Sequence, residues 1–279
     1  MKAPQFAYAK PAVLAEVFAL LDQHGDDAKL LAGGQSLVAT LNMRLSSPSI
    51  LVDVTSLPGL RGITLAGNVL RIGALTTHLD IERSSVIAEH APLLTQAVPH
   101  IAHVAIRNSG TLGGSLAFAD PAAEWPACML ALDASFVLAS KSGERTVKAR
   151  DFFEGLYSTQ LRAHEMITAI TMPLAAGYRS AFLELARRHG DYAIAGIAAV
   201  AKKDGANLRD VRLAYLGVGA TPILAKNAMA ATEGKFDIKA AQDALAKDLD
   251  PIADLYSSAP MKLHLAKVLT GRALNALNG

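Results

Sequence analysis

The stretch Leu30-Leu31-Ala32-Gly33-Gly34-Gln35-Ser36-Leu37 decides the first part of the fold. The apolar run that begins at Ala28 predicts a short buried strand, and this strand leads directly into the adjacent glycines. Ser36 stands where the N-cap of a helix belongs. The apolar face of that helix would consist of Leu37, Val38, Leu41 and Leu45. The pattern predicts a compact α/β unit with a glycine turn between a strand and a helix.

The surrounding sequence extends this unit in both directions. Apolar residues at helical spacing predict a helix over 14–21, and Gly25 suits its C-terminal cap. Alternating or continuous apolar runs predict strands and hairpins. They cover 50–54, 63–75 with a turn at Gly67-Asn68, 135–147 with a turn at 141–143, and 166–172, which stops at Pro173. One helical stretch is predicted over 80–106, and a buried helix over 122–132.

A domain boundary is expected after Pro173, in the segment Leu174–Gly177. Beyond it, apolar strands are predicted over 193–201 and 211–218, followed by two helices near the C-terminus. The fold class is therefore predicted to be α+β. A larger α/β domain would span residues 1–175, and a smaller domain with an antiparallel sheet and helices would span 176–279.

Composition excludes several classes of function. The chain has 279 residues and a net charge of +2, and no run of Lys or Arg exceeds two residues. A nucleic-acid or acidic-lipid target is therefore not expected. The only cysteine, Cys128, excludes an iron–sulfur cluster or a cysteine-based zinc site built from this chain alone. The N-terminal residues lack the apolar stretch of a signal peptide, and the longest apolar run, 192–201, is too short to span a membrane. We therefore expect a cytoplasmic protein.

Charged residues make up 19% of the chain, below the usual quarter of a soluble protein. This low fraction favours a surface that is partly covered by partner chains, although a high alanine content has the same effect.

A second glycine cluster, Gly110-Thr111-Leu112-Gly113-Gly114-Ser115, shares with the first its adjacent glycines and neighbouring hydroxyl residues. Such loops let backbone N–H groups converge on an anion, and two of them suit the two halves of a pyrophosphate. A single Gly-Gly pair is more often only a turn. A nicotinamide dinucleotide site at Gly217-Val218-Gly219 is disfavoured, because Pro222 stands where the helix should open and the third glycine is missing.

No catalytic residue and no metal site is predicted. His100 and His103 share a predicted helical face but have no further ligands beside them. Cys128 is expected in the core. Trp125 and Phe118 are suited either to the core or to contact with a flavin, with the core as the default.

Three long motifs follow one another in order over almost the full chain. They are Leu31–Leu37 with Asn42–Leu45 and Leu51–Val54, then Ile106–Ala117 with Ala119–Glu124, and finally Ala186–Ala193. A further similar segment is Lys267–Thr270. Together they resemble the FAD-binding medium subunits of the xanthine dehydrogenase and carbon monoxide dehydrogenase family.

This resemblance implies a two-part FAD-binding domain of the PCMH type and assigns roles to individual residues. The two glycine loops would wrap the pyrophosphate and ribityl of FAD, Glu124 would lie near the ribityl chain, and Tyr192 would lie beside the isoalloxazine. Ile167 matches an apolar position in the wall of the cofactor site. The residues assigned to the cofactor are Ala32, Gly33, Gly34, Gln35, Ser36, Leu37, Ala102, Ile106, Gly110, Thr111, Gly113, Gly114, Ser115, Glu124, Ile167 and Tyr192.

The resemblance also implies an assembly. A large subunit would carry a molybdenum–pterin centre, and a small subunit would carry two [2Fe–2S] clusters. This chain would take their electrons through FAD and pass them to an external acceptor, in a dimer of heterotrimers. One alternative is a self-contained flavin-dependent oxidoreductase with the same FAD-binding fold. Another is a flavin-free scaffold subunit, for which the glycines would be simple turns.

Overall fold

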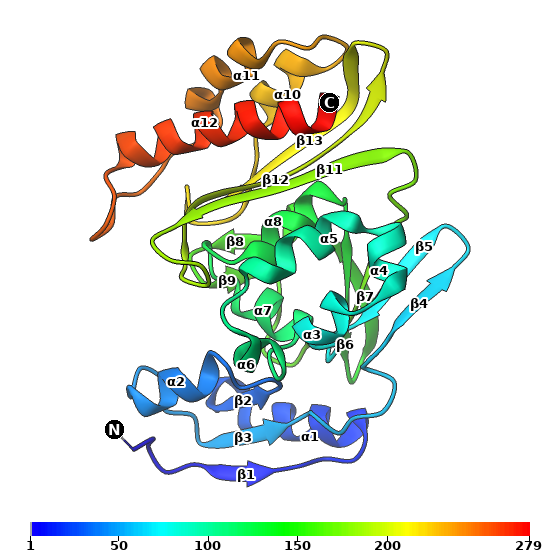
Figure 1. The fold of residues 1–279 in the computed structure, drawn as a ribbon. Helices are drawn as coiled ribbons and strands as arrows, with labels where there is room; N and C mark the ends of the chain where they lie inside the picture. The colour runs from blue at the N-terminus through cyan, green and yellow to red at the C-terminus, as the bar shows by residue number, and fades with distance from the viewer. Residues whose placement is uncertain (1) are drawn as a thin grey trace.

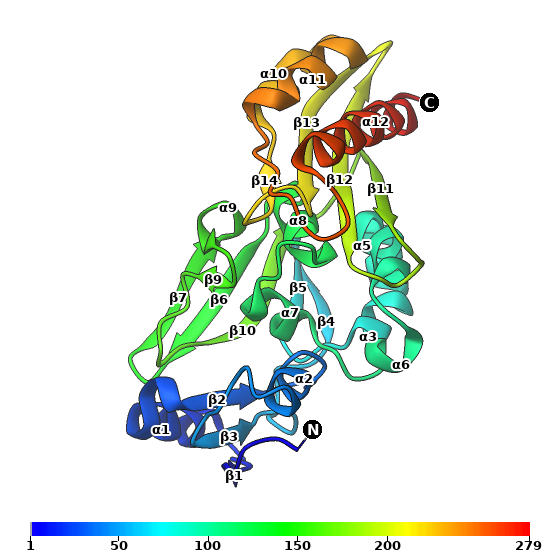
Figure 2. The same ribbon diagram turned by 90° about the vertical axis from the view of Figure 1, so that its left-hand side faces the viewer.

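The computed structural model describes residues 2–279 and stacks them in three tiers (Figures 1 and 2). The N-terminal tier is a three-stranded parallel sheet in the order β1-β3-β2. Helix α1 packs on it through Val17, Phe18 and Leu21 and ends at Gly25, whose φ of 54° suits glycine. The elements of this tier are β1 (Ala7–Ala9), α1 (Leu14–His24), η1 (Gly25–Asp27), β2 (Ala28–Leu31), α2 (Leu37–Asn42) and β3 (Ile50–Asp53).

The middle tier is built on a five-stranded antiparallel sheet in the order β4-β5-β10-β6-β7. Its hairpins turn at Gly67 and Gly143, as the sequence predicts. The strands are β4 (Ile63–Ala66), β5 (Val69–Gly73), β6 (Ser135–Ser140), β7 (Gly143–Lys148) and β10 (Met166–Pro173), with a small ribbon of β8 (Phe153–Gly155) and β9 (Ser158–Thr159). The helices are α3 (His78–Glu82), α4 (Ser85–His90), α5 (Pro92–Ala97), η2 (Val98–His100), α6 (Val104–Arg107), α7 (Leu112–Phe118), α8 (Glu124–Ala131) and α9 (Ala149–Phe152).

The prediction of one helical stretch over 80–106 is wrong in detail. The chain forms α3, α4, α5, η2 and α6 instead. Ser84 caps α4 through the backbone N–H of Ile87, and Pro92 opens α5. Pro99 lies in η2, and Ala102 takes a positive φ of 44°, so a continuous helix is not possible here.

The C-terminal tier is a four-stranded antiparallel sheet in the order β11-β12-β13-β14. Its elements are β11 (Tyr178–Ala186), β12 (Ala193–Asp204), β13 (Asn207–Leu216), β14 (Ile223–Leu224), α10 (Lys226–Thr232), α11 (Ile238–Ala244), η3 (Leu245–Lys247) and α12 (Ala259–Asn278). The sequence predicts β12 and β13 but not β11, and it predicts fewer helices than the structure contains.

Both faces of the β11–β14 sheet are buried. Residues such as Phe182, Ala198 and Leu216 belong to the core of the middle tier, whereas the intervening Ile197 and Tyr215 belong to the core beneath α10, α11 and α12. This double burial explains why β12 reads as a continuous apolar run instead of an alternating one. The sheet is therefore a wall shared by two cores.

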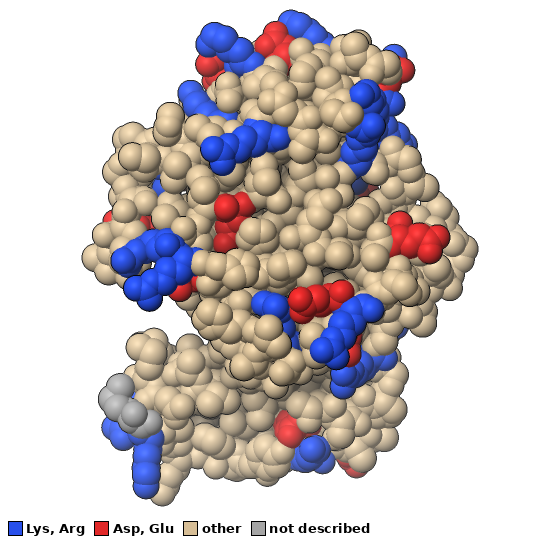
Figure 3. Space-filling model, viewed as in Figure 1, with Lys and Arg blue, Asp and Glu red and all other residues tan. Residues whose placement is uncertain are grey.

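The α+β class and the order of an α/β domain before an antiparallel sheet with helices are confirmed. The chain crosses between the tiers near residues 173–178, and the boundary at residue 175 remains a prediction. Within residues 2–279, no helix has the length and apolar character needed to cross a membrane. On the face in Figure 3, acidic and basic side chains are scattered among broad uncharged areas, and no extended basic patch is seen.

Candidate functional site

A cavity of about 520 Å³ lies where the three tiers meet, and its walls are largely apolar. Figure 3 shows the surface notched between the lower and middle parts of the molecule. The chain segments that line the cavity include three that carry the sequence motifs, namely Ala32–Leu37, the loop from Gly110 into α7, and Gly190–Tyr192. All of the residues that the sequence assigns to the cofactor line this one cavity. The structure therefore brings them together, while their contact with FAD remains a prediction.

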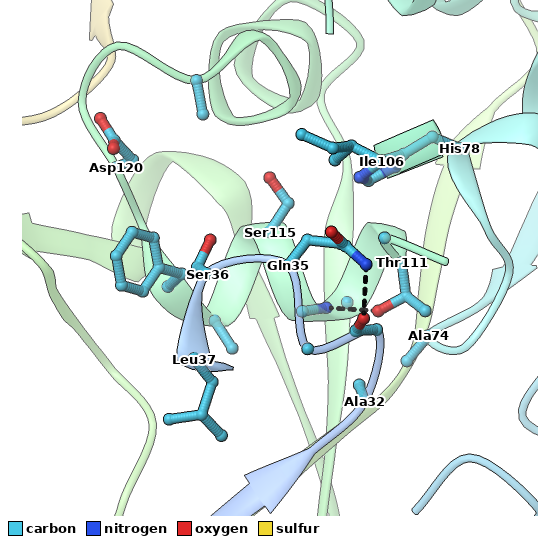
Figure 4. A pocket seen from close by; sticks show the side chains of 18 of the residues that line it. Ala32, Gln35, Ser36, Leu37, Ala74, His78, Ile106, Thr111, Ser115 and Asp120 are labelled. Atoms are coloured by element: carbon cyan, nitrogen blue, oxygen red, sulfur yellow. Dashed lines mark hydrogen bonds between the residues drawn. The ribbon is translucent and has the colours of Figure 1, made fainter. Parts of the chain in front are cut away.

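The first glycine loop presents unused backbone donors. The N–H groups of Gly34, Gln35 and Ser36 donate no hydrogen bond within the described residues. Gly34 has a φ of 71°, and the side-chain amide of Gln35 bends back to the carbonyl oxygen of Gly33 at 3.3 Å (Figure 4). Successive free amides around a left-handed residue form a concave anion-binding nest. The loop is thus suited to a negatively charged group.

Ser36 does not cap α2 as predicted. It occupies the N-cap position, but its side chain makes no capping hydrogen bond. Its hydroxyl points toward the space between the two glycine loops (Figure 4). The predicted apolar face of α2 is also largely wrong, since only Leu41 is buried, whereas Val38 and Leu45 are exposed.

The second glycine loop differs from the expectation, because the N–H groups of Gly113, Gly114 and Ser115 are already used by the protein. The Gly113 N–H bonds the carbonyl oxygen of Ala74 at 2.8 Å, and the Gly114 N–H bonds the Thr111 hydroxyl at 3.2 Å, which caps α7. The Ser115 N–H bonds the carbonyl oxygen of Thr111. The hydroxyl of Ser115, by contrast, faces the open space (Figure 4). This loop therefore offers a hydroxyl group and close approach, and the first loop offers the amides.

Several glycines are required by contacts inside the protein. A Cβ on Gly33 would collide with the carbonyl oxygen of Ser109, and a Cβ on Gly113 would stand 2.6 Å from the Cβ of Ala74. Real Cβ atoms essentially never come this close to another heavy atom, so only glycine lets Gly33 pack on Ser109 and Gly113 pack on Ala74. The glycines thus fix the shape of the cavity as well as admitting a ligand.

Buried acids form one side of the cavity. Burial, helped by the charge of nearby Asp120, raises the pKa of Glu124 to about 7. Burial also raises the pKa of Asp120. Behind the wall, burial and the charge of Glu124 raise the pKa of Glu184 to about 8, and its Oε2 has no hydrogen-bond partner. These carboxyl groups hold protons near neutral pH more readily than exposed acids do.

Tyr192 lies on the turn between β11 and β12, at the edge of the cavity, with a fractional exposure of 75%. Gly190 anchors this turn with a φ of 85°, and a Cβ on it would stand 2.8 Å from the carbonyl oxygen of Ala102. Partial desolvation of the phenol, together with the charges of Asp120 and Glu124, raises the pKa of Tyr192. The third motif therefore places an exposed aromatic ring at the rim of the cavity.

The sequence misses other lining residues. They include Lys29, Leu75, His78, Ile101, Asp120, Leu161, Glu165, Met166, Gly190 and Asp191. His78 follows Thr77, which forms a capping box with Asp80, and this pattern is the sequence signal that could have drawn attention to it. Trp125 and Cys128 are fully buried core residues, as expected, whereas Phe118 lines the cavity.

The structure also describes the two sites that the sequence disfavours, the histidine pair and the glycines at 217–219. His100 and His103 do not share one helix, since His100 lies in η2 and His103 precedes α6. No group of three or more His, Cys, Asp or Glu side chains able to hold a metal occurs in residues 2–279. Gly217 has a φ of 75°, which suits a turn, and its N–H donates a long-range hydrogen bond to the carbonyl oxygen of Pro121.

Comparison with known proteins agrees with this geometry. Residues 4–175 match the FAD binding domain in molybdopterin dehydrogenase, and residues 180–277 match the CO dehydrogenase flavoprotein C-terminal domain. The chain is 38% identical to the carbon monoxide dehydrogenase medium chain of Hydrogenophaga pseudoflava, over 98% of this chain and 97% of that protein. It is 39% identical to 6-hydroxypseudooxynicotine dehydrogenase complex subunit alpha of Paenarthrobacter nicotinovorans, over 98% of this chain and 95% of that protein.

A solved structure extends the likeness to three dimensions. It is carbon monoxide dehydrogenase from Hydrogenophaga pseudoflava, with 40% identity and a TM-score of 0.97 over 99% of this chain and 98% of that one. Sequence similarity, the fold and the convergence of the predicted residues on one cavity indicate the same family. The chain therefore belongs to the family of FAD-binding medium chains of molybdopterin-dependent dehydrogenases.

Proposed function

We propose that this chain is the FAD-carrying electron-transfer subunit of a molybdenum hydroxylase. It takes electrons from [2Fe–2S] clusters of a small partner subunit and passes them to an external acceptor. The observation that carries the proposal is the single cavity on which both glycine loops and the third motif converge.

The residues present fit a bound FAD. The pyrophosphate of the cofactor needs several donors, and the free amides of Gly34, Gln35 and Ser36 with the hydroxyl groups of Ser36 and Ser115 supply them. The apolar wall suits a planar ring system. When bound, the flavin supplies the redox chemistry of the site.

The chain itself supplies binding, orientation and electrostatics. The nest at Gly34 holds negative charge, and the buried carboxyl of Glu124 can donate or accept a hydrogen bond because its pKa is close to 7. Tyr192 stands exposed at the rim of the cavity, where its ring can contact a bound flavin. None of these side chains is arranged as a nucleophile with an adjacent base.

The partners, compartment and domain limits are part of the same proposal. A large subunit carries the molybdenum–pterin centre, and a small subunit carries two [2Fe–2S] clusters, because a chain whose only cysteine is Cys128 cannot ligate such clusters with cysteine. The assembly is a dimer of heterotrimers in the cytoplasm. The two domains are residues 1–175 and 176–279, a division supported by family matches that end at 175 and begin at 180.

A matched pair of glycine variants tests the phosphate assignment. Gly34→Ala puts a Cβ on a residue with a φ of 71°, which strains the nest, and FAD affinity should fall about tenfold or more. The control, Gly67→Ala, imposes the same kind of strain at a hairpin turn far from the cavity, where a Cβ meets nothing within 4 Å. Equal FAD affinity in the two variants would remove the assignment of Gly34 to the pyrophosphate.

An anaerobic experiment separates the electron relay from a self-contained flavoenzyme. The FAD-loaded chain is mixed with aldehydes, purines and other heterocycles while the flavin absorbance is followed. We expect no bleaching until the iron–sulfur and molybdenum subunits are added. Bleaching by a substrate alone would favour the self-contained flavoenzyme, and a colourless chain that takes up no FAD would favour the scaffold.

A further inference from the structure

His78 is a buried polar side chain that lies against the second glycine loop. It is the first residue of α3, and its backbone N–H bonds the carbonyl oxygen of Gly110 at 2.9 Å. Its side chain has a fractional exposure of only 5% and nevertheless lines the cavity. The capping box of Thr77 and Asp80 fixes the start of α3 and so holds the imidazole in place.

Trp125 determines which nitrogen of the imidazole carries the proton. The indole Nε1–H of Trp125 donates a hydrogen bond to Nδ1 of His78 at 3.0 Å. An indole N–H can only donate, so Nδ1 must accept and the proton of the neutral ring sits on Nε2. Burial and the positive charge of Arg107 lower the pKa of His78 to about 4, which keeps the ring neutral at physiological pH.

The Nε2–H group faces the cavity wall at Gly110. A Cβ on Gly110 would stand 2.7 Å from Nε2, so glycine at this position leaves the imidazole edge uncovered. No acceptor for Nε2–H is found among residues 2–279. Figure 4 shows His78 and Asp120 on opposite sides of the opening above the glycine loops. The neutral imidazole of His78 therefore presents an Nε2–H donor at the cavity, and no described residue accepts a hydrogen bond from it.

We propose that His78 is a cofactor-binding residue whose Nε2–H donates a hydrogen bond to an acceptor atom of bound FAD, and that Trp125 positions it by fixing its tautomer. The inference rests on the proposed function, since it requires FAD in this cavity. Nε2 is not among the fully buried side-chain atoms that lack a partner, so it stays reachable from the cavity, where an acceptor atom of a ligand can take the place of water. Because Gly110 has no Cβ, the space beside Nε2 that such a contact needs stays open.

Two substitutions of His78 separate the role of its Nε2–H as a donor from the role of its Nδ1 as the acceptor for Trp125. His78→Asn keeps an oxygen that can accept from Trp125, but its side chain ends before the position of Nε2. His78→Gln reaches that position and carries an amide donor. We expect His78→Asn to weaken FAD binding roughly three- to tenfold, the loss of one neutral hydrogen bond, and His78→Gln to restore most of it. The binding constants are measured on the full chain by titration of FAD-depleted protein.

A spectroscopic measurement on the unmodified chain gives a second readout. With ¹⁵N-labelled histidine, the Nδ1 and Nε2 resonances should report the Nε2–H tautomer. On addition of FAD the Nε2–H proton should shift and exchange more slowly with water. This experiment keeps the inference testable if a variant folds poorly, which is checked by urea unfolding followed through the fluorescence of Trp125, the only tryptophan.

The outcomes are distinguishable. If the unmodified chain binds no FAD, the proposed function fails. If it binds FAD, but His78→Asn binds equally well, or His78→Gln is as weak as His78→Asn, or the Nε2–H signal is unchanged by FAD, then the assignment of His78 is wrong and the proposed function stands.

Discussion

Replacing Glu124 with glutamine should make the stability of the FAD-free chain less dependent on pH. Burial raises the pKa of this carboxyl from its ordinary 4.5 to about 7 in the folded chain. Between these two values the folded state keeps a proton that the unfolded state releases, so the free energy of unfolding falls as pH rises. Since one pKa unit corresponds to about 1.4 kcal/mol, the loss that Glu124 causes is about 3 kcal/mol above pH 7.

Glutamine is neutral at every pH and nearly the same size, so Glu124→Gln removes this loss. We expect its free energy of unfolding, relative to the unmodified chain, to rise by up to about 3 kcal/mol between pH 5 and pH 8. Urea unfolding at both pH values, followed by Trp125 fluorescence, measures the difference. Because both chains retain Glu184, the comparison isolates position 124 and the influence of its charge on that neighbour. Equal differences at pH 5 and pH 8 would refute the reasoning.

Further predictions concern the rim and floor of the cavity. Tyr192→Ala should change stability by no more than about 0.5 kcal/mol, because the residue is exposed, yet it should shift the flavin spectrum or reduction potential; an unchanged spectrum, potential and reoxidation rate would exclude contact with the ring. Gly113→Ala should cost about 1–3 kcal/mol in urea unfolding, because the added methyl overlaps Ala74. Its control is Gly155→Ala, where the nearest atom to the new Cβ is 3.9 Å away and little loss is expected; a loss as large as that of Gly113→Ala would contradict the packing argument.

Local signals predict those parts of the fold that depend on neighbours in sequence. Gly25 ends α1, Gly67-Asn68 turns the β4–β5 hairpin, and β10 ends at Pro173. The strand β11 is missed because its sequence mixes polar and apolar residues, and tertiary pairing with β12 determines its structure. Tertiary context overrides propensity again at α7, which is helical despite Gly113 and Gly114.

The candidate site shows the same division. Motifs similar to those of a known family identify the loops and Tyr192, but not which groups of each loop are free. That question depends on distant partners: Ala74 takes the N–H of Gly113, while the amide of Gly34 has no such partner. His78 is missed because its role depends on Trp125, which is 47 residues away in sequence.

The β11–β14 sheet, whose two faces belong to two different cores, determines how the chain should behave when it is cut. Phe182 and Leu216 of the C-terminal sheet complete the core of the preceding domain, so a fragment that ends near residue 175 would leave that core open to water. A single proteolytic nick at Gly177, a solvent-facing turn with a φ of 74°, should therefore yield two polypeptides that stay associated. The two fragments on either side of Gly177 share one core. We therefore expect each fragment, when it is produced alone, to be insoluble unless the other fragment is present.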